Sequence, residues 1–394
     1  MEYLPWGNKQ NLTDDEFFNR NYELDNIKRL LASTSQENAP DILLTGVRGV
    51  GKTEFLKKIK RDTEGYLTIY MDFSNAMCFQ KRNMSIIGLI EYYFNEIIKE
   101  CEKNNILTLS TKINKFFKTK DYSIKDITSV NGFPVPIPES KDNTKKVLDF
   151  VLNLPNEIYN ENKDKFKGII IFIDEFQIIK ELNDYLESFL WIFRSYAQNQ
   201  RNVAYVLSGS MSLQDDLIET IAGHGGVFGG RMLTLNLSPF SKQTVKEYLN
   251  EKSPNLLLTD KGFDRFYKCT SGLPSYINTF GRLLPKDVEL DDKTVKEEFN
   301  MLIPNIATHL LTVWGRLSLK EQNIIISLLN NPLKRKDIAN SMKVTSGSLS
   351  KSLIKLQNLD LIRFNNNLYE ISEPILAKWL KLEYENKGVY PYRV

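Results

Sequence analysis

The sequence has few of the residues that form disulfides and zinc sites. Its 394 residues include only three cysteines and two histidines, and neither His224 nor His309 lies near a cysteine. The cysteines are far apart and odd in number, which is typical of a protein from a reducing cytoplasm without a disulfide framework. A zinc site is therefore not expected.

Long apolar runs and a large net charge are also missing. No apolar run approaches the length needed to span a bilayer, and the first ten residues lack the basic start and apolar core of a signal peptide. We therefore expect a cytoplasmic protein that does not contact membranes. The formal net charge is only +3, so binding of nucleic acid must be argued locally. Residues 315–394 contain 13 Lys and Arg against 7 Asp and Glu, which indicates a separate partner for this part.

Strand-like and helical segments alternate along the first 240 residues. Short strands are expected at 41–46, 65–75, 167–177, 202–210 and 231–240. The run at 169–173 is apolar at every position, which indicates a strand buried on both faces. The alternation predicts a doubly wound α/β domain with a parallel sheet. An amphipathic helix with acidic residues in its first turn is expected at 14–33.

The remaining segments set the expected domain boundaries. We place the α/β core at 1–239, with an insertion at about 104–146 that contains a proline-rich loop or short hairpin. Residues 240–314 are mostly helical. Residues 315–394 have three short helices and two strand-like runs around an Asn-rich turn, the pattern of a winged helix.

Three glycines separate the first strand from the following helix. The stretch GVRGVGKT at 46–53 fits G-x-x-x-x-G-K-[ST]. Such a loop turns backbone N–H groups toward a phosphate chain, and its lysine and threonine meet the β- and γ-oxygens and Mg²⁺. A glycine-rich turn without a ligand is the alternative, but the position between strand and helix favours nucleotide. The expected binding residues are Gly46, Val47, Arg48, Gly49, Val50, Gly51, Lys52, Thr53 and Glu54.

An acidic pair follows the continuous apolar strand. Asp174 stands at the strand end, where a carboxylate can hold Mg²⁺ together with Thr53. Glu175 comes next, where it can orient and deprotonate the water that attacks the γ-phosphate. No Asn-Lys-x-Asp guanine motif is present, so ATP is preferred to GTP.

The ordered set of motifs resembles the AAA+-like P-loop ATPases of the archaeal ATPase and STAND group, which are related to origin-recognition initiators. The resemblance rests on FFNRNYEL, GVRGVGKT, FIDEFQ, LSGS, GGRMLTLNLSPF, SGLPSYI and the winged-helix pattern, over nearly the full length. It implies that 240–314 form a helical lid over the nucleotide. It also implies that Arg20 and Glu23 help to frame adenine, although an exposed ion pair is the alternative. Pro274 is implied to pack near adenine, and Arg282 is the candidate for a second sensor arginine.

The same resemblance assigns two further roles. Ser208 or Ser210 is expected to hydrogen-bond the γ-phosphate or the attacking water, and we favour Ser208; a plain turn is the alternative. Arg231 is expected to offset charge on the transferred phosphoryl group, in cis or across a subunit boundary. A surface arginine at a strand edge is the alternative for Arg231.

The C-terminal domain has a basic surface that can meet duplex DNA. The third helix can enter a major groove, and neighbouring cations can contact phosphates. The expected contacts are Lys334, Arg335, Lys336, Ser348, Lys351, Lys355 and Arg363. We therefore predict a Mg²⁺-dependent ATPase that hydrolyses ATP to ADP and phosphate, as a switch controlling a DNA-binding winged helix. The alternative is a STAND-like signalling or defence switch whose winged helix docks a protein partner, and a homo-oligomer is compatible with both.

Overall fold

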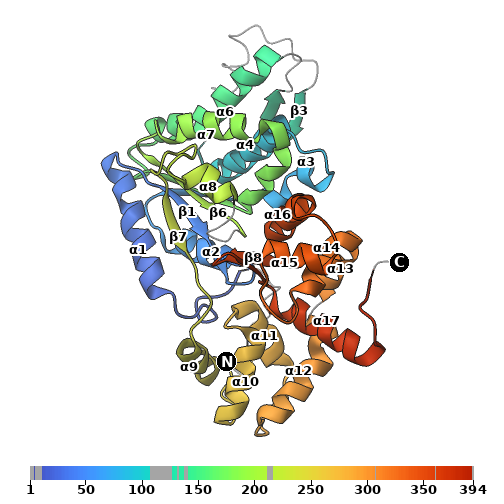
Figure 1. Cartoon of the computed structure of the whole chain (residues 1–394). Coiled ribbons are helices and arrows are strands. Elements are labelled where there is room, and N and C mark those ends of the chain that lie inside the picture. Colours follow the sequence, from blue (N-terminus) through green and yellow to red (C-terminus); the bar gives the residue numbers. More distant parts are fainter. Residues whose placement is uncertain are drawn as a thin grey trace.

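A computed structural model describes Leu4 and residues 11–106, 127–130, 133–136, 141–210, 216–306, 308–359 and 361–392. Its centre is a five-stranded parallel sheet in the order β2-β5-β6-β1-β7 (Figure 1). The strands are β1 (Asp41–Thr45), β2 (Leu67–Asp72), β5 (Ile169–Asp174), β6 (Val203–Ser208) and β7 (Leu233–Asn236). All five predicted strands are present, so the expected doubly wound α/β domain is confirmed.

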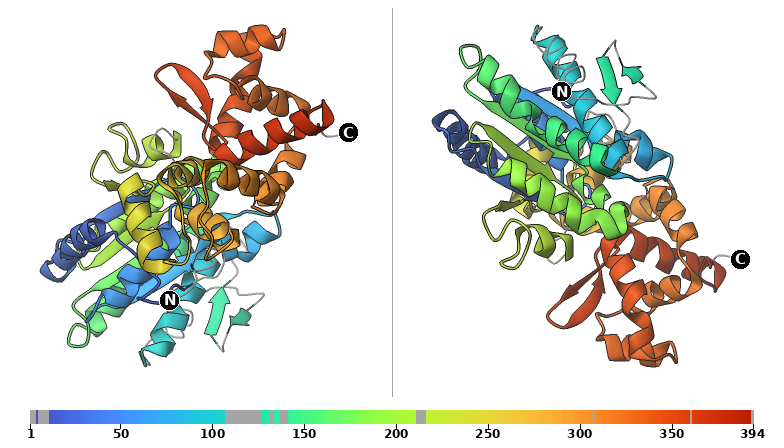
Figure 2. Two further views of the ribbon diagram at one scale, coloured as in Figure 1. Left: turned by 90° about the horizontal axis from the view of Figure 1, so that it is seen from below. Right: turned by 90° about the horizontal axis from the view of Figure 1, so that it is seen from above.

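Helices cover both faces of this sheet, which explains why β5 and β6 are buried at every position. One face packs against α1 (Asn21–Ala32) and α2 (Lys52–Asp62). The other packs against α4 (Ile86–Lys103), α6 (Lys141–Glu161), α7 (Leu186–Ala197) and α8 (Asp216–Ala222). Figure 2 shows the sheet between these two helical layers. Short turns of helix, α3 (Met77–Gln80) and the 3₁₀ segments η1 (Ser33–Gln36), η2 (Phe73–Asn75) and η3 (Phe176–Tyr185), join these elements.

The first helix begins later than the sequence pattern predicted. α1 starts at Asn21 rather than near residue 14, because Asn19 and Arg20 have left-handed backbones with φ of 63° and 69°. Two such residues in succession cannot continue a right-handed helix. The acidic residues at 14–16 therefore lie in the segment that leads into α1. This segment contacts Glu54, just after the glycine-rich loop 46–53.

The expected insertion is described only in part. β3 (Ile127–Val130) and β4 (Phe133–Pro136) pair antiparallel as a hairpin. This agrees with the hairpin alternative for the proline-rich stretch. Residues 107–126, 131–132 and 137–140 of the insertion lie outside the described residues.

A helical segment follows the last strand of the sheet and packs against the side that carries α1 and α2. It contains α9 (Lys242–Lys252), α10 (Asp260–Thr270), α11 (Pro274–Leu283), α12 (Asp292–Ile306) and α13 (Thr308–Arg316). Buried residues of α9–α12 belong to the same core cluster as α1, α2 and their face of the sheet. The helical lid thus packs continuously with the side of the sheet that carries the glycine-rich loop.

The C-terminal domain has the predicted winged-helix arrangement. Its elements are α14 (Leu319–Ser327), α15 (Arg335–Ser341), η4 (Ser346–Leu349), α16 (Ser350–Asn358), β8 (Ile362–Asn365), β9 (Leu368–Ile371) and α17 (Pro374–Lys387). β8 and β9 form the antiparallel wing, and Asn366 and Asn367 both have positive φ in its turn. A Ser318–Glu321 capping box starts α14. Trp379 of α17 packs edge-on against Trp314 of α13, which joins this domain to the lid.

Candidate functional site

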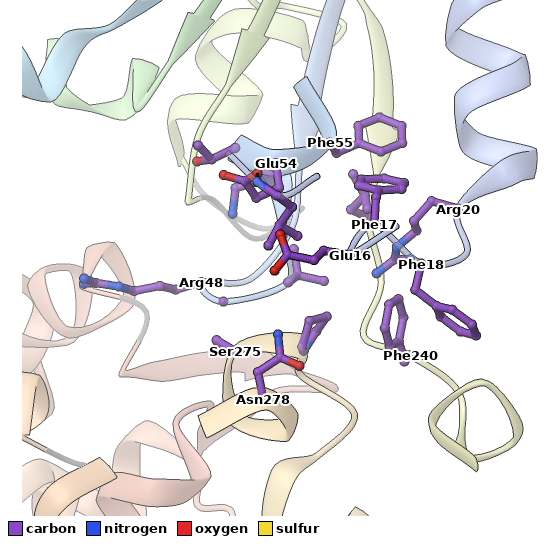
Figure 3. A pocket seen from close by; sticks show the side chains of 18 of the residues that line it. Glu16, Phe17, Phe18, Arg20, Arg48, Glu54, Phe55, Phe240, Ser275 and Asn278 are labelled. Carbon is purple, nitrogen blue, oxygen red and sulfur yellow. Dashed lines mark hydrogen bonds between the residues drawn. The ribbon is translucent and has the colours of Figure 1, made fainter. Parts of the chain in front are cut away.

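The glycine-rich loop, the segment before α1 and the lid helix α11 enclose a cavity of about 430 Å³ (Figure 3). One end is polar and is lined by the loop 48–54, Glu175 and Ser210. The other end is mostly apolar and is lined by Phe17, Phe18, Leu237, Phe240, Tyr248 and Pro274. This division matches a nucleotide, which has a charged phosphate chain at one end and an aromatic base at the other.

The loop glycines occupy backbone shapes that side chains would block. Gly46, Gly49 and Gly51 have φ of 148°, 82° and 98°. A Cβ on Gly46 would lie 2.6 Å from the Leu237 carbonyl oxygen, and one on Gly49 would overlap the Ser275 hydroxyl. The loop therefore passes close to β7 on one side and to the lid on the other.

Lys52, the first residue of α2, is held against this loop. Its side chain is buried, and its Nζ donates to the carbonyl oxygens of Gly46 at 2.6 Å and Val47 at 3.2 Å. Nζ also lies 3.5 Å from the Ser210 hydroxyl, which it can donate to. The ammonium thus stands at the N-terminus of α2, where both the lysine and the helix dipole attract an anion.

Asp174 at the end of β5 is the acceptor for two hydroxyl groups. Thr53 Oγ1 donates to Asp174 Oδ2 at 2.6 Å, and Tyr70 Oη donates to the same oxygen at 3.1 Å. Burial and the neighbouring Asp174 charge raise the pKa of Tyr70, so its hydroxyl stays protonated and remains a donor. Sequence reasoning missed Tyr70, because only the pairing of β2 with β5 brings it beside Asp174.

Thr53 and Asp174 fit a magnesium ion that also binds phosphate. Among the described residues, no cluster of three or more His, Cys, Asp or Glu side chains can hold a metal by itself. Mg²⁺ in nucleotide sites takes one or two protein ligands and completes its shell with phosphate oxygens and water. The hydroxyl and carboxylate, 2.6 Å apart, supply the protein share of such a shell.

Glu175 has a left-handed backbone, with φ of 52°, directly after the strand. Its carboxylate lines the cavity and accepts a hydrogen bond from Gln177 Nε2. Gln177 Oε1 in turn accepts from the backbone N–H of Ser210 at 3.1 Å. Burial raises the pKa of Glu175, and the Gln177 hydrogen bond and the Lys52 charge oppose that rise. Gln177 was not predicted as a site residue, although its position two residues after Glu175 was visible in the sequence.

The two serines of LSGS have different surroundings. Ser208 ends β6, is fully buried, and its hydroxyl has no hydrogen-bond partner within the described part of the chain. Ser210 lines the cavity next to Lys52 and Glu175. The structure therefore places Ser210, and not the favoured Ser208, at the phosphate end of the cavity. Ser208 still belongs to β6, and the chain comes within reach of the glycine-rich loop only two residues later, at Ser210.

The segment before α1 forms one wall of the base end. The Glu54 carboxylate accepts from the backbone N–H groups of Asn11 at 3.1 Å and Leu12 at 2.8 Å, so Glu54 fastens this segment to α2. Arg20 is buried, donates to the Ser238 carbonyl oxygen at 2.6 Å and lies over the Phe240 ring. Arg20 thus joins the segment before α1 to the residues that follow β7.

Of the other residues to which the resemblance assigns a role, some line the cavity and some lie outside it. Glu23 pairs with Arg20 at 3.2 Å but does not line the cavity, whereas Arg20 is buried and does line it, so this is not the exposed ion pair of the alternative. Pro274 lines the cavity as predicted for the lid. Arg282 instead donates to the Leu4 carbonyl oxygen at 2.7 Å, and Arg231 is exposed just before β7. Neither arginine is among the described residues that line the cavity.

The expected DNA-contacting residues differ in how far they are engaged within the domain. Arg335 donates to the carbonyl oxygen of Ser346 at 2.8 Å and to the Ser350 hydroxyl. Lys355 pairs with Glu321 at 2.9 Å, and Arg363 pairs with Glu370 at 2.7 Å. The remaining predicted residues are exposed: Lys334, Lys336, Ser348 and Lys351.

Comparison with known proteins decides the family. The model of an ATPase domain predominantly from Archaea matches residues 17–280. The chain belongs to this family. It is 25% identical over 275 residues to an uncharacterized ATP-binding protein of Methanocaldococcus jannaschii, covering 66% of this chain and 68% of that one. The protein is therefore a P-loop ATPase, as the motifs predicted.

The chain also resembles solved structures of other proteins. The Walker-type ATPase of Pyrococcus abyssi superposes with a TM-score of 0.63 at 19% identity, covering 95% of this chain and 99% of that one. The Aeropyrum pernix ORC1 protein, solved with DNA, gives a TM-score of 0.48 at 14% identity, covering 97% and 96%. Within the described ranges of the ATPase, no helix is both long and apolar enough to cross a bilayer.

Proposed function

We propose that this ATPase hydrolyses Mg²⁺-ATP to ADP and phosphate and that the bound nucleotide controls how its winged helix binds duplex DNA. The proposed units are residues 1–239 as the ATPase core, 240–314 as the lid and 315–394 as the winged-helix domain. The observation that carries the proposal is a junction where the nucleotide loop, the lid and the winged-helix domain meet.

The junction begins at the crest of the nucleotide loop. The Gly49 carbonyl oxygen accepts a hydrogen bond from the backbone N–H of Ser275, the second residue of α11, at 3.2 Å. Arg48 extends away from the cavity toward the C-terminal domain (Figure 3). A loop that wraps around phosphates therefore touches the lid on one side and faces the winged helix on the other.

The winged-helix end of the junction is Glu373, which caps α17. Tyr276 Oη of the lid donates to Glu373 Oε1 at 2.7 Å, and Ile375 N donates to the same oxygen at 3.2 Å. Burial raises the pKa of Glu373, and the positive charge of Arg48 opposes that rise. A shift of the loop or lid with the nucleotide is expected to act on α17 through these groups.

Residues of the cavity supply the hydrolytic chemistry. The Lys52 ammonium and the N-terminus of α2 bind the phosphate chain, and Glu175 orients and deprotonates the attacking water. Mg²⁺ held by Thr53 and Asp174 neutralises phosphate charge when it is bound. The exposed position of Arg231 supports a role across a subunit boundary rather than within its own cavity.

Duplex DNA is the proposed ligand of the winged helix because of its exposed cations. Lys334, Lys336 and Lys351 are exposed on and before α15 and at the start of α16. The alternative, docking of a protein partner as in a STAND-like switch, has its own support. Ile354 and Leu359 of the α16 segment are 46% and 42% exposed, so both apolar side chains are available to pack against a protein partner.

Duplex binding by the full chain, measured over a series of salt concentrations, tests this proposal. We expect affinity to fall steeply as salt rises, because lysine contacts release counterions from DNA. Changing Lys334 and Lys336 to Ala should weaken binding to all sequences and flatten the salt dependence. An absence of duplex binding at low salt, with ATP present, would reject the DNA ligand and leave the protein-docking alternative.

A further inference from the structure

Asn278 is a buried polar side chain at the base end of the cavity. It lies on the lid helix α11, is only 6% exposed and lines the cavity. Its Oδ1 accepts a hydrogen bond from Tyr248 Oη at 2.6 Å. No hydrogen bond to its Nδ2 is found within the described ranges. Because Asn278 lines the cavity, this nitrogen is available as a hydrogen-bond donor to a ligand acceptor.

Tyr248 binds the oxygen of this amide. Burial raises the pKa of Tyr248, so its hydroxyl stays protonated and donates to the amide oxygen. The amide nitrogen must then point in the other direction, and Figure 3 shows it directed into the cavity. With the amide oxygen bonded to Tyr248, Nδ2 is the amide group that a ligand in the cavity meets.

Glu16 adds an acceptor to the same cavity. It belongs to the segment before α1 and lines the cavity. Its Oε2 accepts from the backbone N–H of Thr13 at 2.9 Å, which anchors the side chain. Figure 3 shows the Glu16 carboxylate inside the cavity, between the loop and the lid. An anchored acceptor and an oriented donor therefore come from opposite walls.

We propose that Asn278 determines the base specificity of this ATPase, with Glu16 as its complement. Asn278 Nδ2 donates to N1 of adenine, and Glu16 accepts from the adjacent 6-amino group, whereas guanine carries a hydrogen on N1 and has no acceptor for this donor. Guanine has a carbonyl oxygen in place of the amino group, which the Glu16 carboxylate repels. The inference rests on the proposed function, since it requires ATP in this cavity.

The test compares nucleotides that differ by single groups. Displacement of a fluorescent ATP analogue from the full chain would give affinities for ATP, GTP, 1-deaza-ATP and 7-deaza-ATP. Asn278→Leu keeps the side-chain size but removes the donor, and we expect it to weaken ATP about tenfold, the effect of one buried hydrogen bond. GTP affinity should not change. 1-Deaza-ATP should bind the wild type about tenfold more weakly than ATP, and Asn278→Leu should not weaken that analogue further, whereas 7-deaza-ATP should bind the wild type like ATP.

Two further variants keep the test decisive. Glu16→Gln replaces a half-buried carboxylate with an amide that can donate to guanine, so it should narrow the preference for ATP over GTP. It also serves if Asn278→Leu fails to fold. Tyr248→Phe keeps the ring that lines the base end but removes the hydrogen bond to the Asn278 amide, and it should give a smaller loss for ATP.

The failures of the two proposals can be told apart. If the wild type binds no nucleotide, or if Lys52→Ala binds ATP normally, the nucleotide site itself is wrong. If ATP binding depends on Lys52 but the ATP-to-GTP ratio is the same in the wild type, Asn278→Leu and Glu16→Gln, only the assignment of base specificity is wrong. Equal weakening of both deaza analogues in the wild type and in Asn278→Leu would also overturn it.

Discussion

Gly49→Ala should weaken ATP binding by disturbing both the nucleotide loop and its contact with the lid. Gly49 has φ of 82°, and a non-glycine residue in this left-handed region costs about 1–3 kcal/mol. The added methyl group would also overlap the Ser275 hydroxyl, next to the hydrogen bond from Ser275 N to the Gly49 carbonyl. A free loop can relax this strain but a nucleotide-bound loop cannot, so affinity should fall by roughly 10- to 100-fold.

Paired variants separate the clash from the backbone strain. Ser275→Ala removes the hydroxyl, so Gly49→Ala/Ser275→Ala should recover part of the lost affinity and Ser275→Ala alone should have little effect. Gly388→Ala is the matched control, because Gly388 has φ of 71° with open space around it and is remote from the cavity. Titration with a fluorescent ATP analogue measures all four proteins. Wild-type affinity in Gly49→Ala, or a double variant no better than Gly49→Ala, would refute the contact between loop and lid.

Four other substitutions test the catalytic assignments and the structural role of Arg335 in the winged-helix domain. Glu175→Gln should keep ATP binding but slow phosphate release by roughly 10²–10⁴. Because burial raises the pKa of Glu175, wild-type turnover should decline on acidification at a pH above the ordinary carboxyl pKa of about 4.3. Glu175→Gln should lack that decline. Wild-type turnover in Glu175→Gln would mean that another group activates the water. Arg231→Ala should abolish any rise of specific activity with protein concentration, and flat wild-type activity on dilution would reject a role in trans. Arg335→Ala should lower the unfolding temperature of the chain more than Lys334→Ala, because Arg335 donates hydrogen bonds to Ser346 and Ser350 around the turn before α16, and equal midpoints would contradict this.

Much of the fold follows from local patterns in the sequence. The five strands could be predicted because each is a short run rich in apolar and β-branched residues; β5 and β6 are buried throughout, whereas β7 is largely exposed. The P-loop could be predicted because its glycines are required by the backbone shape. The start of α1 could not, since the left-handed conformations of Asn19 and Arg20 leave no sign in the apolar periodicity.

The site residues that sequence reasoning missed are those brought in by tertiary pairing. Tyr70 meets Asp174 only because β2 lies beside β5, and Asn278 reaches the base end only because the lid folds back over the loop. The choice between Ser208 and Ser210 depends on where β6 ends relative to Lys52, which is a matter of one or two residues. A sequence motif does not specify distances between side chains on different strands and helices.

Control of DNA binding by nucleotide is the central claim, and it can be measured directly. Fluorescence anisotropy of a labelled duplex would give the affinity of the full chain carrying Glu175→Gln, first with Mg²⁺-ATP and then with ADP. We predict affinities that differ at least fivefold between the two nucleotides, which corresponds to about 1 kcal/mol of coupling between the sites. Adding Lys52→Ala should remove the difference. Equal duplex affinity with ATP and ADP, in a protein shown to bind both, would contradict the account.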